Sequence, residues 1–251
     1  MSVKDIMRNI KMVIQYDGAR YKGWQKQTDD VNTVQGRLEE ILSGMTGENL
    51  QLTGCGRTDA GVHALNYTAN FHTNSTMSTE TMFKYINDNL PDDIALLSAK
   101  DASERFHARY NILSKTYLYR INNSRVRSVF DRRYVYNINE QLNLENMRLC
   151  SEALTGTHDF QSFTTLKSKT KSTIRTINYI NIEEKDGVIQ IEINGNGFLW
   201  NMVRIILGTL IEAGKGRLKV KDVEDILNAK KRAEAGPMVP AKALFLKEVF
   251  Y

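Results

Sequence analysis

The chain is poor in cysteine and proline. Its two cysteines, Cys55 and Cys150, lie far apart in the 251 residues, which excludes a disulfide framework and indicates two core thiols in a reducing compartment. There are only three prolines, and no proline-rich or low-complexity segment separates one part of the chain from another. We therefore expect two halves that share a continuous sheet rather than two domains joined by a flexible linker.

A long apolar segment is also absent. The longest such run, 198–211, contains Asn201 and Arg204 and is shorter than the ~20 residues that a membrane-spanning helix needs. The first residues, MSVKDIMRNIKMV, place charges among the apolar positions and lack a small-residue cleavage site, which does not fit a secretory signal. We expect a cytoplasmic protein with no membrane partner.

Two common types of ligand site are missing from the pattern. The four histidines show no metal-ligand spacing with each other or with the cysteines. The stretch NGNGFLW has Gly195 and Gly197 but lacks the third glycine and the acidic partner of a dinucleotide site. We interpret it as a turn from a strand into a helix, and the pattern predicts neither a zinc site nor a dinucleotide site.

The composition that remains is that of a mildly basic globular protein. Apolar residues make up 41% of the chain, which is enough to bury a core. Lys and Arg number 34 against 29 Asp and Glu, giving a net charge of +5. This excess is compatible with a polyanionic partner such as RNA but does not require one.

The hydrophobic spacing predicts alternating strands and helices. In the first half we expect helices capped by Asn32 and Ser78, and strands at 11–16, 50–55, 65–71 and 94–99. This order of elements is the split ferredoxin-like arrangement, which RRM modules share. In the second half we expect helices at 143–154, 199–213 and 221–229, and strands at 116–121, 133–138, 174–182, 188–194 and 243–251. The fold class is α+β, with domains at 1–104 and 105–251.

One loop between two expected strands stands out, TGCGRTDAGVHA at 53–64. Gly56 and Gly61 permit backbone conformations that other residues resist, so the loop can be tight and can approach a ligand closely. Arg57 and Asp59 allow two interpretations. They could form an ion pair or an Asx-turn in an ordinary connection, or the arginine could hold the carboxylate ionised as a nucleophile or base.

The stretch GRTDAGVHA at 56–64 resembles the signature of the tRNA pseudouridine synthase A family. Other matching stretches are YDGARYKGWQKQ, NLPDDIA, FHARY, SKTYLYRI, DF followed by SF, and GFLWNMVRIILGTL. The resemblance implies the pseudouridine synthase fold, in which two ferredoxin-like or RRM-like halves share a continuous, mainly antiparallel sheet. Its helices pack on one side, and its first half carries the catalytic loop of a central active-site cleft that the second half completes.

The resemblance implies an enzyme that isomerises uridine in RNA to pseudouridine without a cofactor or metal. Asp59 matches the catalytic carboxylate, and the sequence leaves open whether it attacks covalently or promotes a glycal-like intermediate by proton transfer. Arg204 matches an arginine that faces the aspartate and keeps it ionised. Tyr117 matches the tyrosine that stacks on the target base, and Arg57 is expected to help hold the extruded nucleotide. Without the resemblance, Arg204 could be a surface residue and Tyr117 a core residue.

Further basic residues are candidate RNA contacts. Arg109 is interpreted either as a phosphate or sugar contact or as part of a structural salt bridge. Lys167, Lys169 and Lys171 lie in a stretch without acidic residues, which is either a phosphate-binding loop or a solvated one. A second basic cluster contains Arg125, Arg127, Arg132 and Arg133.

The chain departs from the family pattern at two places. It has Asn66-Tyr67 where a Gly-Gln pair is common, and Pro240 is followed by Ala243-Leu244 where a Gly-Leu is usual. Both changes could reshape the rim that selects RNA. The resemblance implies uridine on the 3′ side of the tRNA anticodon stem-loop, at positions 38, 39 and 40, as the substrate. Because the two departures lie at this rim, ribosomal RNA is an alternative, and a non-catalytic RNA-binding or RNA-folding protein is another. The resemblance also suggests a homodimer.

Overall fold

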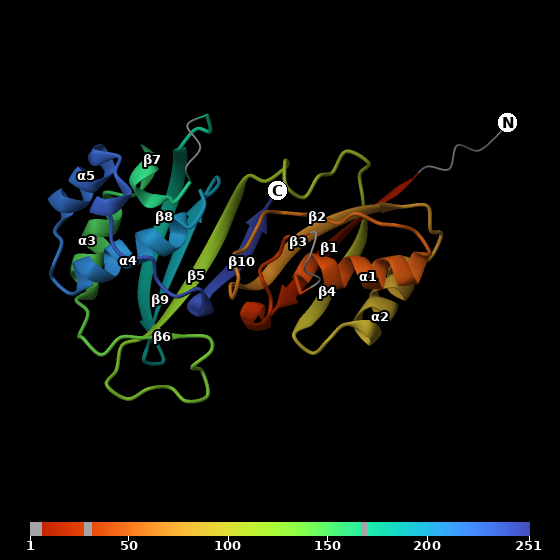
Figure 1. Cartoon of the computed structure of the whole chain (residues 1–251), viewed down its shortest axis with the longest axis horizontal. Coiled ribbons are helices and arrows are strands. Elements are labelled where there is room, and N and C mark those ends of the chain that lie inside the picture. The colour runs from red at the N-terminus through yellow and green to blue at the C-terminus, as the bar shows by residue number, and fades with distance from the viewer. Residues whose placement is uncertain (1–6, 28–31, 167–169) are drawn as a thin grey trace. The chain divides into compact units, whose positions relative to one another are not determined.

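The computed structural model describes residues 7–27, 32–166 and 170–251 (Figure 1). The chain forms two compact units. The first contains the residues up to Leu113 together with Leu246–Tyr251, and the second contains Ser114–Phe245. The domain ranges 1–104 and 105–251, which followed from the order of the expected strands and helices, stay a prediction.

The first unit has the split ferredoxin-like order that the sequence predicted. Its elements are β1 (Arg8–Tyr16), α1 (Val34–Thr46), β2 (Thr53–Gly54), β3 (His63–Thr73), α2 (Thr79–Asn89) and β4 (Ile94–Ala102), with a short 3-10 turn at Gly18–Arg20. The strands lie in the order β4-β1-β3-β2, and each neighbouring pair is antiparallel. Helices α1 and α2 lie beside each other on one side of these strands (Figure 1).

The core of the first unit follows from side-chain alternation. On β1, every second residue from Ile10 to Tyr16 is buried, because successive side chains of a strand point to opposite faces. The fully buried apolar residues of β1, α1 and α2 include Ile10, Met12, Ile14, Leu38, Leu42, Met82 and Ile86. In each helix the two buried residues, Leu38 and Leu42 in α1 and Met82 and Ile86 in α2, are four positions apart. Each helix therefore turns one apolar stripe toward the sheet.

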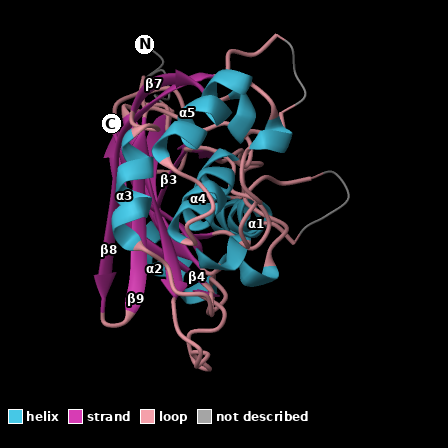
Figure 2. Ribbon diagram, turned by 90° about the vertical axis from the view of Figure 1, so that its left-hand side faces the viewer, coloured by secondary structure: helices cyan, strands magenta, loops and turns pink. Residues whose placement is uncertain are grey.

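The second unit is also α+β. Its elements are β5 (Ser114–Asn122), β6 (Tyr136–Asn137), α3 (Leu144–Glu152), β7 (Gly156–Asp159), β8 (Ile174–Lys185), β9 (Val188–Gly195), α4 (Met202–Gly214) and α5 (Val220–Ala229), with 3-10 turns at Gln161–Phe163, Arg232–Glu234 and Ala241–Ala243. The strand order is β6-β5-β9-β8-β7, and only β6 pairs in parallel. Helix α3 packs against β8 (Figure 2).

The last strand, β10 (Leu244–Phe250), begins in the second unit and ends in the first. At its end, the backbone N–H of Leu113 donates to the carbonyl of Phe250 at 2.9 Å. The hydroxyl of Tyr251 donates to the carbonyl of Ala108 at 2.7 Å, and Nζ of Lys11 lies 4.5 Å from the centre of the Tyr251 ring. The C-terminal residues are thus part of the packing of the first unit.

The mixed α+β class and the dominance of antiparallel pairs are confirmed. The continuous sheet through both halves and the central cleft stay predictions. Among the described residues, no helix has both the length and the apolar character needed to cross a membrane.

The expected strand at 50–55 is shorter than predicted, because helix side chains occupy part of its backbone. Only Thr53–Gly54 pairs with β3. The N–H of Leu52 donates to Oε1 of Glu39 at 3.0 Å, and the carbonyl of Leu52 accepts from Nε2 of Gln35 at 3.0 Å. Leu52 therefore completes its hydrogen bonds without a neighbouring strand.

The expected strand at 133–138 is likewise reduced to Tyr136–Asn137. The N–H groups of Tyr134 and Val135 both donate to the carbonyl of Asp131, at 2.7 and 3.1 Å, so this part of the chain is a turn. The strand β7 was not expected.

The first helix begins one residue later than predicted. Its cap is Thr33, whose side chain accepts from the N–H of Gly36 at 3.2 Å, and Asn32 instead donates to the carbonyl of Arg20 at 2.6 Å.

Candidate functional site

The loop between β2 and β3 holds Asp59 in a tight turn. The N–H of Val62 donates to the carbonyl of Asp59 at 3.1 Å, which closes the turn. Gly61 within it has a φ of +78°, a conformation that disfavours any residue with a Cβ. The N–H of Cys55 donates to the carbonyl of Thr68 at 2.9 Å, which ties the start of the loop to β3. The carboxylate is therefore presented at partial exposure by a fixed backbone.

Two glycines of the stretch 16–27 lie directly against this loop. A Cβ on Gly18 would stand 2.0 Å from the carbonyl oxygen of Val62, and a Cβ on Gly23 would stand 2.5 Å from that of Thr58. Gly23 also has a φ of +94°. Because both distances are far below van der Waals contact, only glycine lets this segment support the loop so closely.

The same stretch also bonds to Thr58, the residue before the carboxylate. The N–H of Trp24 donates to the carbonyl of Thr58 at 3.2 Å, and the hydroxyls of Tyr16 and Thr58 are 2.9 Å apart. Thr58 itself is buried. These hydrogen bonds from buried residues therefore fix the backbone next to Asp59 in space.

An aromatic cluster supports the loop from β3. The rings of Trp24 and Tyr67 are stacked with centroids 3.8 Å apart, and Tyr16 lies 5.7 Å from Tyr67. The hydroxyl of Tyr67 donates to the carbonyl of Gly56. A Cβ on Gly54 would stand 2.1 Å from that hydroxyl. Tyr67, noted in the sequence only as a departure from the family, is thus a positioning residue of the loop.

A buried histidine closes the far end of the loop. His63 is 1% exposed, and its Nδ1 lies 2.9 Å from Oδ1 of Asp17 and 3.1 Å from the backbone nitrogen of Gly18. In the sequence, His63 is one of the four histidines that show no metal-ligand spacing. Among the described residues, no group of three or more His, Cys, Asp or Glu side chains could hold a metal ion.

Arg57 is exposed and is held by an amide, not by Asp59. Its Nε donates to Oε1 of Gln25 at 3.2 Å, and no Arg57–Asp59 ion pair exists, although both residues are described. The Nε2 of Gln25 donates to Gln35 at 2.7 Å, and Gln35 in turn donates to Glu39 at 2.9 Å. The interpretation of Arg57 and Asp59 as a simple ion pair is therefore wrong.

In the second unit, Tyr117 lies in the middle of β5 opposite Ile193 of β9. Its ring is half-buried and meets the ring of Phe198 edge-on, with centroids 5.3 Å apart and an interplanar angle of 87°. Phe198 belongs to the turn between β9 and α4, which confirms the strand-to-helix interpretation of NGNGFLW.

Arg204 lies in the first turn of α4 and is half-buried. Its Nε donates to the carbonyl of Val239 at 2.8 Å, and the N–H of Val239 donates back to the carbonyl of Arg204 at 3.3 Å. The segment around Val239 crosses α4 closely, because a Cβ on Gly208 would stand 1.7 Å from the carbonyl oxygen of Pro237. Backbone atoms thus fix the plane of the guanidinium, and the surface interpretation does not hold.

The remaining predicted contact residues are exposed or lie outside the described part of the chain. Arg109 is exposed and forms no ion pair with any described residue, which removes the salt-bridge interpretation. Lys171 is exposed. Lys167 and Lys169 lie outside the described residues.

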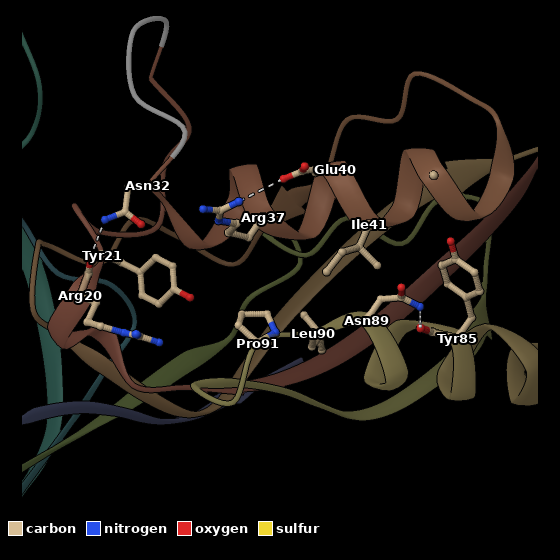
Figure 3. Close-up of a pocket in the computed structure, with 11 residues that line it drawn as sticks. Arg20, Tyr21, Asn32, Arg37, Glu40, Ile41, Tyr85, Asn89, Leu90 and Pro91 are labelled. Atoms are coloured by element: carbon tan, nitrogen blue, oxygen red, sulfur yellow. Dashed lines mark hydrogen bonds and ion pairs between the residues drawn. The ribbon is translucent and has the colours of Figure 1, made fainter.

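A surface pocket of about 740 Å³ lies between α1 and α2 (Figure 3). Its two arginines are both paired, Arg20 with Asp93 at 2.6 Å and Arg37 with Glu40 at 3.3 Å. None of the predicted site residues lines it. Its positive charges are largely neutralised, so we assign it no role in binding an anion.

Comparison with known proteins identifies the family. A family model described as tRNA pseudouridine synthase matches residues 12–111 and 151–251. "tRNA pseudouridine synthase A 1" of Clostridium tetani is 59% identical over 98% of this chain and all of its own length. "tRNA pseudouridine synthase A 2" of Bacillus cereus is 44% identical over 97% of this chain and 99% of its own.

Among solved structures, one from the "Crystal Structure of a Cbf5-Nop10-Gar1 Complex" has a TM-score of 0.39 and 13% identity, covering 81% of this chain and 44% of that one. This likeness is too remote to add to the sequence relatives. On the strength of those relatives and of the matched family model, the chain belongs to the tRNA pseudouridine synthase A family, a family of isomerases.

Proposed function

We propose that this protein isomerises uridine to pseudouridine in tRNA, with Asp59 as the catalytic carboxylate. The observation that carries the proposal is the signature loop itself, which lies inside the matched family segment and is held rigidly by Gly18, Gly23 and Tyr67. The reaction breaks the bond between N1 of the base and C1′ of the ribose and forms the bond between C5 and C1′. One proton leaves C5 and one is taken up at N1, so no redox partner is needed.

Asp59 must be ionised whether it attacks the nucleoside or removes a proton. We assign Arg204 as the cation that faces it, because a guanidinium stabilises the charged form of a nearby carboxylate. Its anchor at the carbonyl of Val239 sets the direction in which the planar group points. Arginine suits this role, since its planar fork can bind both oxygens of one carboxylate.

Tyr117 and Arg57 are assigned to the extruded nucleotide. A half-buried ring on a strand is a rigid surface for the target base, and stacking of this kind is worth ~1–3 kcal/mol per base. Tyr117 lies outside the two matched family segments, so its role depends on its own position in β5. Arg57 has a neutral hydrogen-bond partner and keeps its charge available for the phosphate beside the flipped base.

The wider RNA surface is proposed to include Arg109, Lys167, Lys169 and Lys171. The two residues of this set that are described, Arg109 and Lys171, are exposed. Cationic side chains with no carboxylate partner attract phosphates and release counterions on binding. A cytoplasmic location and a homodimer complete the proposal, and the expected uridines lie on the 3′ side of the anticodon stem-loop.

The test replaces the carboxylate by its neutral isostere. Asp59→Asn should abolish tritium release from a tRNA transcript labelled at C5 of uridine, while the Kd for the transcript stays within several-fold of the wild-type value. Asp88→Asn, which neutralises an exposed carboxylate at the end of α2, is the control and should retain the wild-type rate. Turnover by Asp59→Asn at the wild-type rate would refute the assignment.

A second measurement tests the substrate. Unmodified tRNA and ribosomal RNA transcripts are incubated with the wild-type protein, and pseudouridine is mapped by chemical labelling. Pseudouridine in the anticodon arm of tRNA supports the proposal, whereas modification of ribosomal RNA alone contradicts it. Tight binding with no pseudouridine in either RNA would favour a non-catalytic RNA-binding protein.

A further inference from the structure

A second surface pocket, of about 580 Å³, lies within the second unit. It is formed by the segment between β5 and α3 and by the segment Pro240–Lys242, which precedes β10. Its cationic side chains are Arg127, Arg132 and Lys242, and none of the residues that line it is acidic. Its apolar side chains include Val129, Val135 and Pro240. The pocket therefore combines positive charge with an apolar wall.

The two arginines of this pocket are not paired with carboxylates of the described residues. Neither Arg127 nor Arg132 forms an ion pair with any described residue. Arg132 instead donates to the carbonyl of Val129 at 2.7 Å, and Nζ of Lys242 donates to the carbonyl of Arg132 at 2.7 Å. Of the two carboxylates in the segment between β5 and α3, Asp131 accepts from Oγ of Ser128 at 2.8 Å and Glu140 pairs with Arg217 at 2.9 Å. The pocket between α1 and α2 differs, because both of its arginines are paired.

The walls of the pocket are set by hydrogen bonds within the loop. Nδ2 of Asn122, at the end of β5, donates to the carbonyl of Val126 at 2.9 Å and to Oδ1 of Asn137 at 2.6 Å. Nδ2 of Asn123 donates to the carbonyl of Ile138 at 2.9 Å. A site whose backbone is already ordered spends less free energy on ordering when a ligand binds.

Large apolar side chains at the edge of this loop are unusually exposed. Val129 is 63% exposed and Phe130 is 93% exposed. Exposed apolar groups among unpaired arginines suit a ligand that is both flat and anionic. A nucleotide has these two properties, since its base is a flat ring and its phosphate carries the negative charge.

The pocket shares a backbone segment with the anchor of Arg204. The carbonyl of Val239 accepts from Nε of Arg204 at 2.8 Å. The next carbonyl, that of Pro240, accepts from the hydroxyl of Tyr119 at 3.0 Å. The pocket is thus built next to the carbonyl that anchors Arg204, a proposed catalytic residue of this unit.

We propose that this pocket binds one nucleotide of the substrate RNA other than the target uridine. Its phosphate lies between Arg127 and Arg132, and its base rests against Val129, Val135 and Pro240. This inference rests on the proposed function, because it takes RNA to be the substrate. A second copy of the same chain is a poorer occupant, since an arginine-rich loop gains nothing from a surface of the same sign.

The first experiment compares two double variants that remove the same charge from the same loop. Arg127→Ala with Arg132→Ala removes both arginines of the pocket, and Arg125→Ala with Arg133→Ala removes two that do not line it. Binding of an unmodified tRNA transcript is measured over a range of salt concentrations. We expect the pocket variant to raise Kd at least tenfold and to lower the magnitude of the salt slope by about 0.7–0.9, because one phosphate is no longer neutralised. The other variant should raise Kd less than threefold.

The second experiment tests the apolar wall with two exposed valines of the loop. Val129→Asp places a carboxylate in the pocket, whereas Val126→Asp places one at a site that does not line it and is 76% exposed in the wild-type protein. Val129→Asp should weaken binding at least tenfold more than Val126→Asp. Both positions are exposed, so both variants should unfold at temperatures close to that of the wild type.

The possible outcomes test the pocket and the proposed function independently. If both variants of each pair lose the same amount of tRNA affinity, the proposed role of the pocket is refuted, even where the wild-type protein forms pseudouridine in tRNA. A wild-type protein that binds tRNA without releasing tritium would refute the proposed reaction, and the binding comparison would still test the pocket. A change of sedimentation coefficient in Val129→Asp, with tRNA binding unaltered, would identify the pocket as a protein interface and overturn the proposal.

Discussion

Replacing Gly23 by alanine should displace Asp59, the proposed catalytic carboxylate, while leaving the fold intact. The new Cβ would stand 2.5 Å from the carbonyl oxygen of Thr58 and 3.2 Å from the carbonyl carbon of Asp59. Ordinary contact begins near 3.4 Å, so the loop must retreat by roughly 0.9 Å. A misplacement of ~1 Å in a catalytic group can lower the rate by about 10²-fold. We expect a loss of this size in Gly23→Ala.

Gly47→Ala is the matched control for this variant. Gly47 also has a positive φ, +73°, but a Cβ there would meet nothing within 4 Å. Both variants therefore carry the strain of a left-handed alanine, ~1–2 kcal/mol, and only Gly23→Ala also carries the collision with the loop. Both should lower Tm by several degrees.

The assay is single-turnover tritium release from a C5-labelled tRNA transcript, with enzyme in large excess over its Kd for the RNA. Under these conditions the rate reports the chemical step and not the binding of RNA. If Gly23→Ala keeps the rate of Gly47→Ala, the close approach does not position Asp59, and our account of the loop is refuted.

Two further predictions concern individual hydrogen bonds. Tyr67→Phe keeps the stack on Trp24 but removes the donor to the carbonyl of Gly56, so it should cost about 1 kcal/mol of stability and lower the single-turnover rate; an unchanged rate and Tm would contradict this. The pKa of Asp159 is lowered, because hydrogen bonds from Lys230 and Thr173 outweigh the effect of burial, which acts in the opposite direction. The stabilisation that ionised Asp159 gives the folded protein is therefore fully present above the pKa of this group in the unfolded chain, about 4. It is lost as the pH falls through the lower pKa of the group in the folded protein. Lys230→Met should lower Tm at pH 7, and the difference from wild type should shrink below about pH 4; a difference that stays constant across this range would show that the pair does not contribute.

Much of the fold could be predicted from residue patterns, because burial and capping act locally. The buried alternation of β1 and the Ser78 cap of α2 are visible in the sequence and are present in the structure. The strand at 50–55 could not be placed in this way. Its backbone is bonded by Gln35 and Glu39, and nothing in the local sequence shows that these helix residues point inward.

The candidate site could likewise be predicted only in part. Asp59, Tyr117 and Arg204 were predicted as site residues from motifs that match a family. Their supports were not found, because each depends on an approach between distant parts of the chain. Gly23 meets Thr58 and Val239 meets Arg204 only after folding. The pocket beside Pro240 depends on the loop after β5, which the sequence marked only as basic.

The return of the chain end to the first unit has a consequence for biosynthesis. The unit that carries the signature loop contains Leu246–Tyr251, and Tyr251 bonds to Ala108 and lies under Lys11. A nascent chain that has left the ribosome only as far as β9 possesses the aspartate but not the residues that finish packing around its domain. The first unit can therefore complete its packing only after the segment Leu246–Tyr251 has been synthesised.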